Sequence, residues 1–251
     1  MKLLYFVPLF LAGFFVVHAL KMMRFYLVLL EQKISLKEFA YLYVKTTFLN
    51  LLIPFKLGEV YRAFCVVRFT KCVQTGILSV VLDRFFDTFI LLLFLIPYDF
   101  LVLHRLTFIT GFLLLFLLLV MLIYRMFEPT YRYLNGYMIR NSRSKRGIFI
   151  LSALEMFREW YDYTKDLIGG RQYLIVFNSA LGWIAEFGLL WLISAGLEIG
   201  FGLVEFGDYI QSVFSFEKSA VFLIYNRLSM YLLFALILIF WCIRALGRRK
   251  K

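Results

Sequence analysis

Long apolar runs separated by short polar stretches dominate the hydrophobic pattern of this 251-residue chain. A transmembrane helix needs about 20 consecutive, mostly apolar residues. The apolar runs are too many and too long for a soluble fold, so we predict an all-α, polytopic membrane helix bundle. The five predicted full spans are residues 3–20, 77–97, 106–123, 173–196 and 219–243.

The stretch 39–69 is also apolar, but polar and helix-breaking residues interrupt it. Pro54 and Gly58 both disfavour a continuous helix. A broken helix at membrane depth is tolerated only where it is buried in protein or lines a watery cavity. We therefore predict a re-entrant pair of half-helices, and the alternative is one irregular span followed by an interfacial helix. The interrupting residues are Lys45, Asn50, Pro54, Lys56, Gly58, Glu59 and Arg62.

The composition agrees with a single integral membrane domain over residues 1–251. Hydrophobic residues make up 63% of the chain and aromatic residues 20%, whereas an ordinary soluble domain is roughly half apolar. The net charge of +12 would suggest nucleic acid in a soluble protein. Here the basic residues flank the apolar runs, where cytoplasmic retention and anionic lipid headgroups explain them. We expect no nucleic-acid partner.

The basic connections predict the orientation. Residues 125–171 hold nine Lys or Arg and five Asp or Glu, and the tail 244–251 is basic as well. Both are expected in the cytoplasm. The short connection 98–105 and the acidic stretch 198–218 are expected outside. We predict a multi-pass protein of the inner membrane with a cytoplasmic C-terminus and, with five spans, an external N-terminus.

The predicted cytoplasmic loop, residues 127–171, contains one helical pattern. Its apolar positions follow helical spacing, acidic and basic residues take the other side, and Gly169 and Gly170 end the run. This indicates an amphipathic helix on the membrane surface. A helix packed on the protein's own cytoplasmic face is the alternative. The apolar positions are Ile150, Leu154, Phe157, Tyr161 and Ile168.

Charged residues inside the predicted membrane segments are the candidate functional residues. Each Asp, Lys or Arg at a helix centre costs roughly 2.5 to 3.5 kcal/mol on insertion scales. These residues must therefore line a pocket, form structural ion pairs or reach toward the interface. They fall into three groups: Asn50, Lys56, Glu59 and Arg62; Asp83, Arg84 and Asp87; and Glu186 with Arg227.

This set of side chains suits a lipid headgroup. Arg presents a planar fork of donors that matches phosphate. A carboxylate pairs with the Arg when no ligand is bound, or binds an amine on the headgroup. The break at Pro54 and Gly58 also exposes N–H groups at a helix N-terminus, and such groups bind anions. The three cysteines and two histidines show no metal-ligand spacing, so no metal or cofactor is expected.

Three short motifs carry these residues, and a looser second set follows. The first set is LKMMRF at 20–25, NLLIPFKLGEVYR at 50–62 and VLDRFFD at 81–87, and the second is WIAE at 183–186, GLVE at 202–205 and YNR at 225–227. They resemble motifs of the lysylphosphatidylglycerol synthase transmembrane family, the flippase part of the multiple peptide resistance factor. Phe25 stands where that family has Trp, Asp83 stands where it has Glu, and its Pro-Gly-Gly run before Glu205 is missing.

The resemblance implies a lipid flippase and adds Glu205 to the candidate headgroup-binding residues. The motif spacing repeats, since Gly58 and Glu59 precede Arg84 much as Gly202 and Glu205 precede Arg227. Residues 1–97 and 173–243 would then be two halves of an inverted-topology repeat, joined by a span at 106–126.

The expected function is therefore transport of a phospholipid or of a polyprenyl-phosphate-linked headgroup in cell-envelope biogenesis. The expected partners are membrane lipids, anionic or polyprenyl-phosphate lipids among them, and a membrane protein or a second copy of this chain. An enzyme or accessory factor in polyprenyl-linked glycan assembly is one alternative, although no nucleotide-sugar motif is present. A scaffold that transports nothing is the other.

Overall fold

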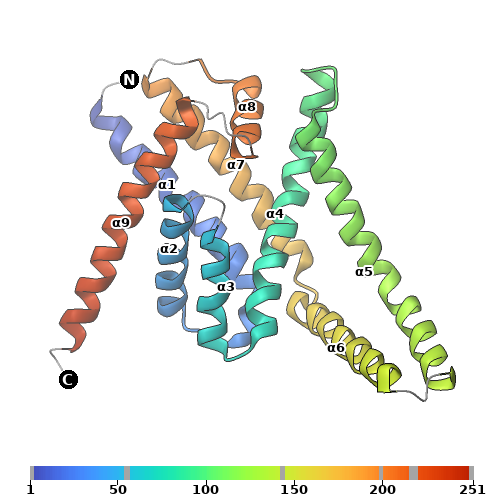
Figure 1. Cartoon of the computed structure of the whole chain (residues 1–251). Coiled ribbons are helices and arrows are strands. Elements are labelled where there is room, and N and C mark those ends of the chain that lie inside the picture. Colours follow the sequence, from blue (N-terminus) through green and yellow to red (C-terminus); the bar gives the residue numbers. More distant parts are fainter. Residues whose placement is uncertain (1–2, 54–56, 142–144, 198–199, 215–219, 249–251) are drawn as a thin grey trace.

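The computed structural model describes residues 3–53, 57–141, 145–197, 200–214 and 220–248. Within these ranges the chain forms nine α-helices, one short 3-10 helix and no β-strand, which confirms the predicted all-α bundle (Figure 1). The elements are α1 (Leu3–Val28), η1 (Leu30–Gln32), α2 (Leu36–Leu52), α3 (Leu57–Thr70), α4 (Val73–Leu101), α5 (Phe108–Asn141), α6 (Lys145–Ile168), α7 (Gln172–Leu197), α8 (Leu203–Phe214) and α9 (Ala220–Arg248).

Four helices in the described ranges are long and apolar enough to cross a membrane. They lie in α1, α5, α7 and α9 and match four of the five predicted spans. The fifth predicted span, 77–97, lies in α4, whose 29 residues are about 43 Å long. Asp83, Arg84 and Asp87 lower the apolar character of α4, although the helix is long enough to cross a bilayer.

The core of the bundle forms where α1 and α7 pack along each other. Phe14 and Val17 of α1 are fully buried, as are Leu190 and Ile193 of α7 at 0% and 1% exposure. The first helix continues eight residues beyond the predicted end at residue 20, as far as Val28. That extension carries Lys21 and Arg24, two basic residues of α1, into the bundle.

The half-helices predicted in the stretch 39–69 correspond to α2 and α3, which begin at Leu36 and end at Thr70. Their 17 and 14 residues correspond to about 25 and 21 Å, less than the roughly 30 Å of a hydrocarbon core. The open ends of this α2–α3 hairpin lie at the same end of the bundle as the C-terminus (Figure 1). Pro54 and the predicted site residue Lys56 lie outside the described residues.

The second broken element corresponds to α8, a helix of 12 residues at the opposite end of the bundle, near the N-terminus (Figure 1). Residues 215–219, which follow α8, lie outside the described residues. The α2–α3 hairpin and α8 lie at opposite ends of the bundle, as the two broken elements of an inverted repeat would. The repeat itself remains a prediction.

The boundary between the linking span and the predicted loop is different in the structure. The helix that begins at Phe108 continues to Asn141, so residues 127–141 are helical and the loop is shorter than expected. The amphipathic pattern lies in α6, which ends before Gly169 and Gly170, both with positive φ. The second half of α6 packs on the protein's own surface, because Leu167 is buried and the Tyr163 hydroxyl lies 2.6 Å from Thr75 Oγ1.

The close approach of α2 and α3 generates a stability prediction. A Cβ added at Gly58 would lie 2.4 Å from the Cα of Asn50, so Gly58→Ala should push the two half-helices apart and lower the thermal unfolding midpoint of the protein in detergent. Gly188→Ala in α7 is the matched control, because a Cβ there meets nothing within 4 Å. Equal midpoints for the two variants would contradict the packing of the α2–α3 hairpin.

Candidate functional site

Asp83 of α4 is the centre of a buried network of ion pairs. Its side chain is 1% exposed and contacts three guanidinium groups from three helices. Arg24 Nε of α1 lies 2.7 Å from Oδ1, whereas Arg84 Nη2 of α4 and Arg62 Nη1 of α3 lie 2.9 and 3.5 Å from Oδ2. Three cations around one carboxylate offset the desolvation of that carboxylate.

Arg24 extends this network to α7. One of its terminal nitrogens contacts Asp87 Oδ1 and donates to Ser179 Oγ at 3.1 Å. The Trp183 indole N–H also donates to Asp87 Oδ1, at 3.1 Å. Asp87 lies one turn after Asp83, so both carboxylates face the same side of α4 and reach α1 and α7 together.

The α2–α3 hairpin joins the network through Glu59 and Arg62. Glu59 Oε1 accepts from Asn50 Nδ2 at 3.0 Å and lies 3.4 Å from Arg84 Nη2, and Glu59 Oε2 lies 3.3 Å from Arg62 Nη1. Arg62 also donates to Thr46 Oγ1 at 3.3 Å, and its guanidinium lies 5.2 Å from the ring centroid of Phe25. Glu59 and Arg62 thereby bind α3 to α4, and Asn50 joins α2 to the network through Glu59.

A second ion pair lies next to this network. Lys21 Nζ of α1 is 2.7 Å from Glu186 Oε2 of α7, and the Tyr209 hydroxyl of α8 donates to Glu186 Oε1 at 2.8 Å. Lys21 also lies 5.8 Å from the ring centroid of Trp183. Because Trp183 hydrogen-bonds Asp87, it connects the two groups of charges.

The eight charged side chains are balanced in number. Lys21, Arg24, Arg62 and Arg84 oppose Glu59, Asp83, Asp87 and Glu186, and every carboxylate has a cation within 3.5 Å. We call this set the charged network.

Two cations of the charged network are the most accessible of its members: the Arg84 side chain is 39% exposed and that of Lys21 29%. A small pocket with an empty volume of about 170 Å³ borders the network on the α1 and α7 side. It is lined by Leu20, Lys21, Arg24, Asp87, Asn178, Ser179, Gly182 and Trp183. Most of the charged network is buried, but a cation is reachable at two points.

The structure brings most of the predicted site residues together and leaves others apart. Those that meet in or against the charged network are Asn50, Glu59, Arg62, Asp83, Arg84, Asp87 and Glu186. Glu205 lies elsewhere: it is exposed at the start of α8 and accepts from the Gly202 backbone N–H at 2.7 Å. Arg227 is exposed on α9 and has no ion pair with any residue that the structure describes.

The predicted set of site residues lacks two members of the charged network, Lys21 and Arg24, and several residues that contact it. The predicted first span ends at residue 20, before Lys21 and Arg24, although Arg24 is 3% exposed in the middle of the network. Lys21 and Arg24 are spaced from Val17 and Val28, both buried, as residues on one helix face are. This spacing is the sequence signal that places them inside the bundle. Trp183 belongs to the WIAE motif, which gave only Glu186 as a site residue, whereas Ser179 and Thr46 carry no comparable signal, because each is an ordinary residue of an apolar helix.

The Arg24–Asp83 pair generates a prediction about stability. Arg24→Gln or Asp83→Asn alone should lower the free energy of unfolding by about 3 kcal/mol, because each leaves a buried charge without a main partner. The double variant should lose less than the sum of the two, with a coupling of about 1 to 3 kcal/mol. Denaturant unfolding in detergent micelles measures the coupling, and strictly additive losses would mean that the two groups do not interact.

The family comparison extends over nearly the whole chain. The model of the family described as lysylphosphatidylglycerol synthase TM region matches residues 1–241. No curated protein and no solved structure matched the chain. The matched range includes every helix that contributes to the charged network, three of the four candidate membrane spans and all but the last two residues of the fourth. The chain is therefore a multi-pass membrane protein that belongs to the lysylphosphatidylglycerol synthase TM region family.

Proposed function

We propose that the protein translocates a membrane lipid whose headgroup carries a phosphate, and that the headgroup binds at the charged network. The observation that carries this proposal is the environment of Arg84. Its guanidinium contacts Glu59, Asp83 and Asp87, yet 39% of the side chain is exposed. Arg is suited to binding phosphate through paired N–H donors.

The balance of charge in the network supports an exchange of partners. A phosphate that reaches Arg84 replaces the contacts to Glu59 and Asp87, both at 3.4 Å, which are longer than the contact to Asp83 at 2.9 Å. Glu59 keeps Arg62 at 3.3 Å and Asn50 at 3.0 Å. No carboxylate of the network is left without a partner, so the exchange avoids the large penalty of an isolated buried charge.

The surroundings of the network support transport of the headgroup along the bundle. The α2–α3 hairpin reaches it from one end of the bundle, and Tyr209 of α8 reaches it from the other through Glu186. In transporters, sites where broken helices meet near the membrane midplane are the ones that open alternately to the two sides. Phospholipids and polyprenyl-phosphate-linked lipids share the required phosphate.

A scaffold that holds a partner without transport is the second candidate, because ion pairs bind α1, α3, α4 and α7 into one unit. On this hypothesis the charged network only stabilises the fold. Removal of Arg84 would then lower the unfolding midpoint of the protein, and purified protein would move no lipid.

The first functional prediction concerns Arg84. The probe is phosphatidylglycerol with a nitrobenzoxadiazole label on one acyl chain, and dithionite bleaching reports its transfer across proteoliposome membranes. Arg84→Gln should slow transfer about tenfold or more, because a hydrogen bond to a charged group contributes about 1.5 to 3 kcal/mol. Arg68→Gln is the matched control, since Arg68 is exposed on α3 and outside the charged network.

Two outcomes of this assay would count against the proposal. Undiminished transfer by Arg84→Gln, with the unfolding midpoint unchanged, would remove Arg84 from the headgroup pathway. Wild-type protein that transfers neither this probe nor a polyprenyl-phosphate probe faster than empty liposomes would contradict the transport proposal and favour the scaffold.

The second functional prediction concerns Arg227, which the motif resemblance had included in the site. Because Arg227 is exposed on α9 and outside the charged network, Arg227→Gln should leave the rate of lipid transfer within about twofold of wild type, as expected for surface substitutions worth no more than about 0.5 kcal/mol. A loss as large as that of Arg84→Gln would mean that the headgroup also contacts α9.

A further inference from the structure

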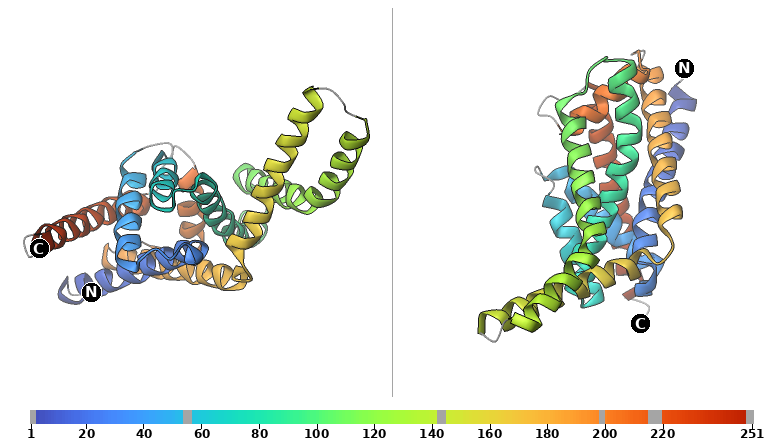
Figure 2. Two further views of the ribbon diagram at one scale, coloured as in Figure 1. Left: turned by 90° about the horizontal axis from the view of Figure 1, so that it is seen from below. Right: turned by 90° about the vertical axis from the view of Figure 1, so that its right-hand side faces the viewer.

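The helices α5 and α6 form an arm that leans sideways from the bundle (Figure 2). At its base, the rings of Phe127 and Tyr161 stack at 4.6 Å, and Lys165 pairs with Glu128 at 3.6 Å. Leu167, closer to the bundle, is buried. The base is therefore fixed to the rest of the protein, and the tip, comprising residues 132–141 of α5 and 145–157 of α6, extends beyond it.

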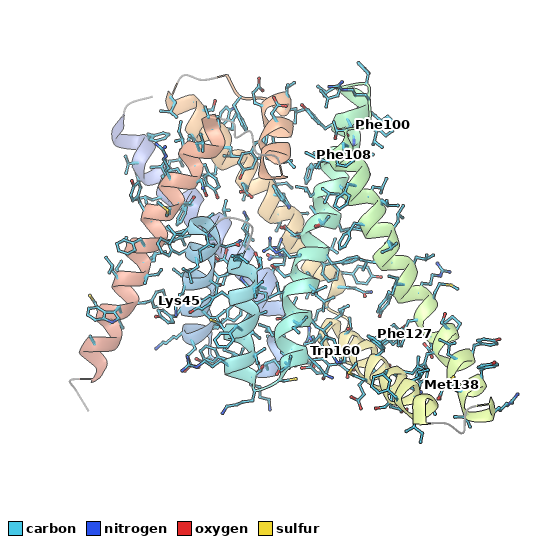
Figure 3. All side chains as sticks on the ribbon, viewed as in Figure 1. Lys45, Phe100, Phe108, Phe127, Met138 and Trp160 are labelled. Atoms are coloured by element: carbon cyan, nitrogen blue, oxygen red, sulfur yellow. The ribbon has the colours of Figure 1, made fainter. Side chains whose placement is uncertain are left out.

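Large apolar side chains are exposed at the tip of the arm. Phe149 is 77% exposed and Tyr133 72%, and Ile139 and Ile148 are each 66% exposed. Figure 3 shows side chains projecting from both helices of the arm around Met138, well away from the bundle. A concentration of exposed apolar groups of this kind marks a surface that contacts a membrane or another protein.

The charge of the tip is positive. Between Glu128 and Glu155 the sequence has no acidic residue and five basic ones, Arg132, Arg140, Arg143, Lys145 and Arg146. Arg140 is exposed and has no ion pair with any residue in the described ranges. Glu155, at the inner limit of the tip, is the first acidic residue of α6, and the other three lie closer to the base, where Asp162 pairs with Arg158 at 3.5 Å.

The position of the tip favours a lipid surface over any other partner. The 34 residues of α5 are about 51 Å long, whereas the hydrocarbon core is about 30 Å thick, so the last part of α5 leaves the bilayer next to its surface. Figure 1 shows the tip at the same end of the bundle as the C-terminus, on the opposite side from α9. The tip is thus tethered close to headgroups, at a high effective concentration.

We propose that the tip of the α5–α6 arm binds the anionic lipid surface of the leaflet beside it. Phe149, Ile148 and Ile139 enter the headgroup layer, and Arg140 binds lipid phosphate. Apolar side chains together with basic ones are the combination that binds anionic interfaces, and each Lys or Arg near such a surface strengthens binding about fivefold. This surface is separate from the charged network, so the proposal does not depend on lipid transport.

The test measures how deeply Phe149 enters the bilayer. The full chain, with Cys65, Cys72 and Cys242 replaced by Ala, carries a nitroxide at Phe149→Cys in nanodiscs of phosphatidylcholine with and without phosphatidylglycerol. Collisions with oxygen and with a water-soluble nickel complex report burial of the label. With phosphatidylglycerol present, the label should become protected from nickel and accessible to oxygen. Arg140→Glu removes one positive charge and adds a negative one. It should weaken binding of the tip to the anionic surface, and with it the protection of the label, by about fivefold for each of these two changes.

The matched control is the same label at Glu159→Cys, on an exposed position of α6 near the base. That label should stay accessible to nickel in both lipid compositions. Equal nickel access at Phe149 in the two compositions would overturn the proposal. Protection that depends only on the number of protein copies in each disc would overturn it too, because it would identify the tip as a contact between two copies.

Discussion

The three guanidinium groups around Asp83 constrain the helices that carry them. A charged group in a low-dielectric interior is stable only where partners surround it, and α4 alone cannot supply them. Arg24 must therefore come from α1 and Arg62 from α3, at 2.7 and 3.5 Å from the carboxylate. The α2–α3 hairpin is short for the same reason: a continuous span would carry Glu59 and Arg62 past Asp83, whereas two half-helices end beside it.

The charges that the sequence places among apolar residues were sufficient to predict much of the site. Charged side chains in hydrocarbon carry a large free-energy cost, and contact between opposite charges lowers it. This predicts that the charged residues of 50–62 and 83–87 lie together. The five predicted spans were close to observed helices because apolar length alone determines them. The length of α5 was underestimated, because charged residues such as Arg125 end an apolar run without ending a helix.

The rest of the site depends on distances that a single sequence does not contain. Arg24 is absent from the predicted set because the predicted first span ends at residue 20, whereas the helix continues to Val28 and places Arg24 on the same face as Val17. Arg227 was included because the spacing of two motifs is similar, yet spacing along the chain does not determine which side of α9 faces the bundle. Trp183 links Asp87 to Lys21 only because α7 packs along α1, which is a property of the folded bundle.

The charged network has four positive and four negative side chains, and this balance affects how tightly it can bind a phosphate. A surplus of arginine would hold a phosphate tightly and release it slowly, whereas a carboxylate already present at each arginine competes with the ligand and limits its affinity. Passage through a membrane requires binding strong enough for the headgroup to enter and weak enough for it to leave. Arg84 fits this requirement, since its contacts to Glu59 and Asp87 are long and its side chain is partly exposed. Arg24 does not, because it is buried between Asp83 and Asp87; in the proposed mechanism it holds α1, α4 and α7 together while partners change at Arg84.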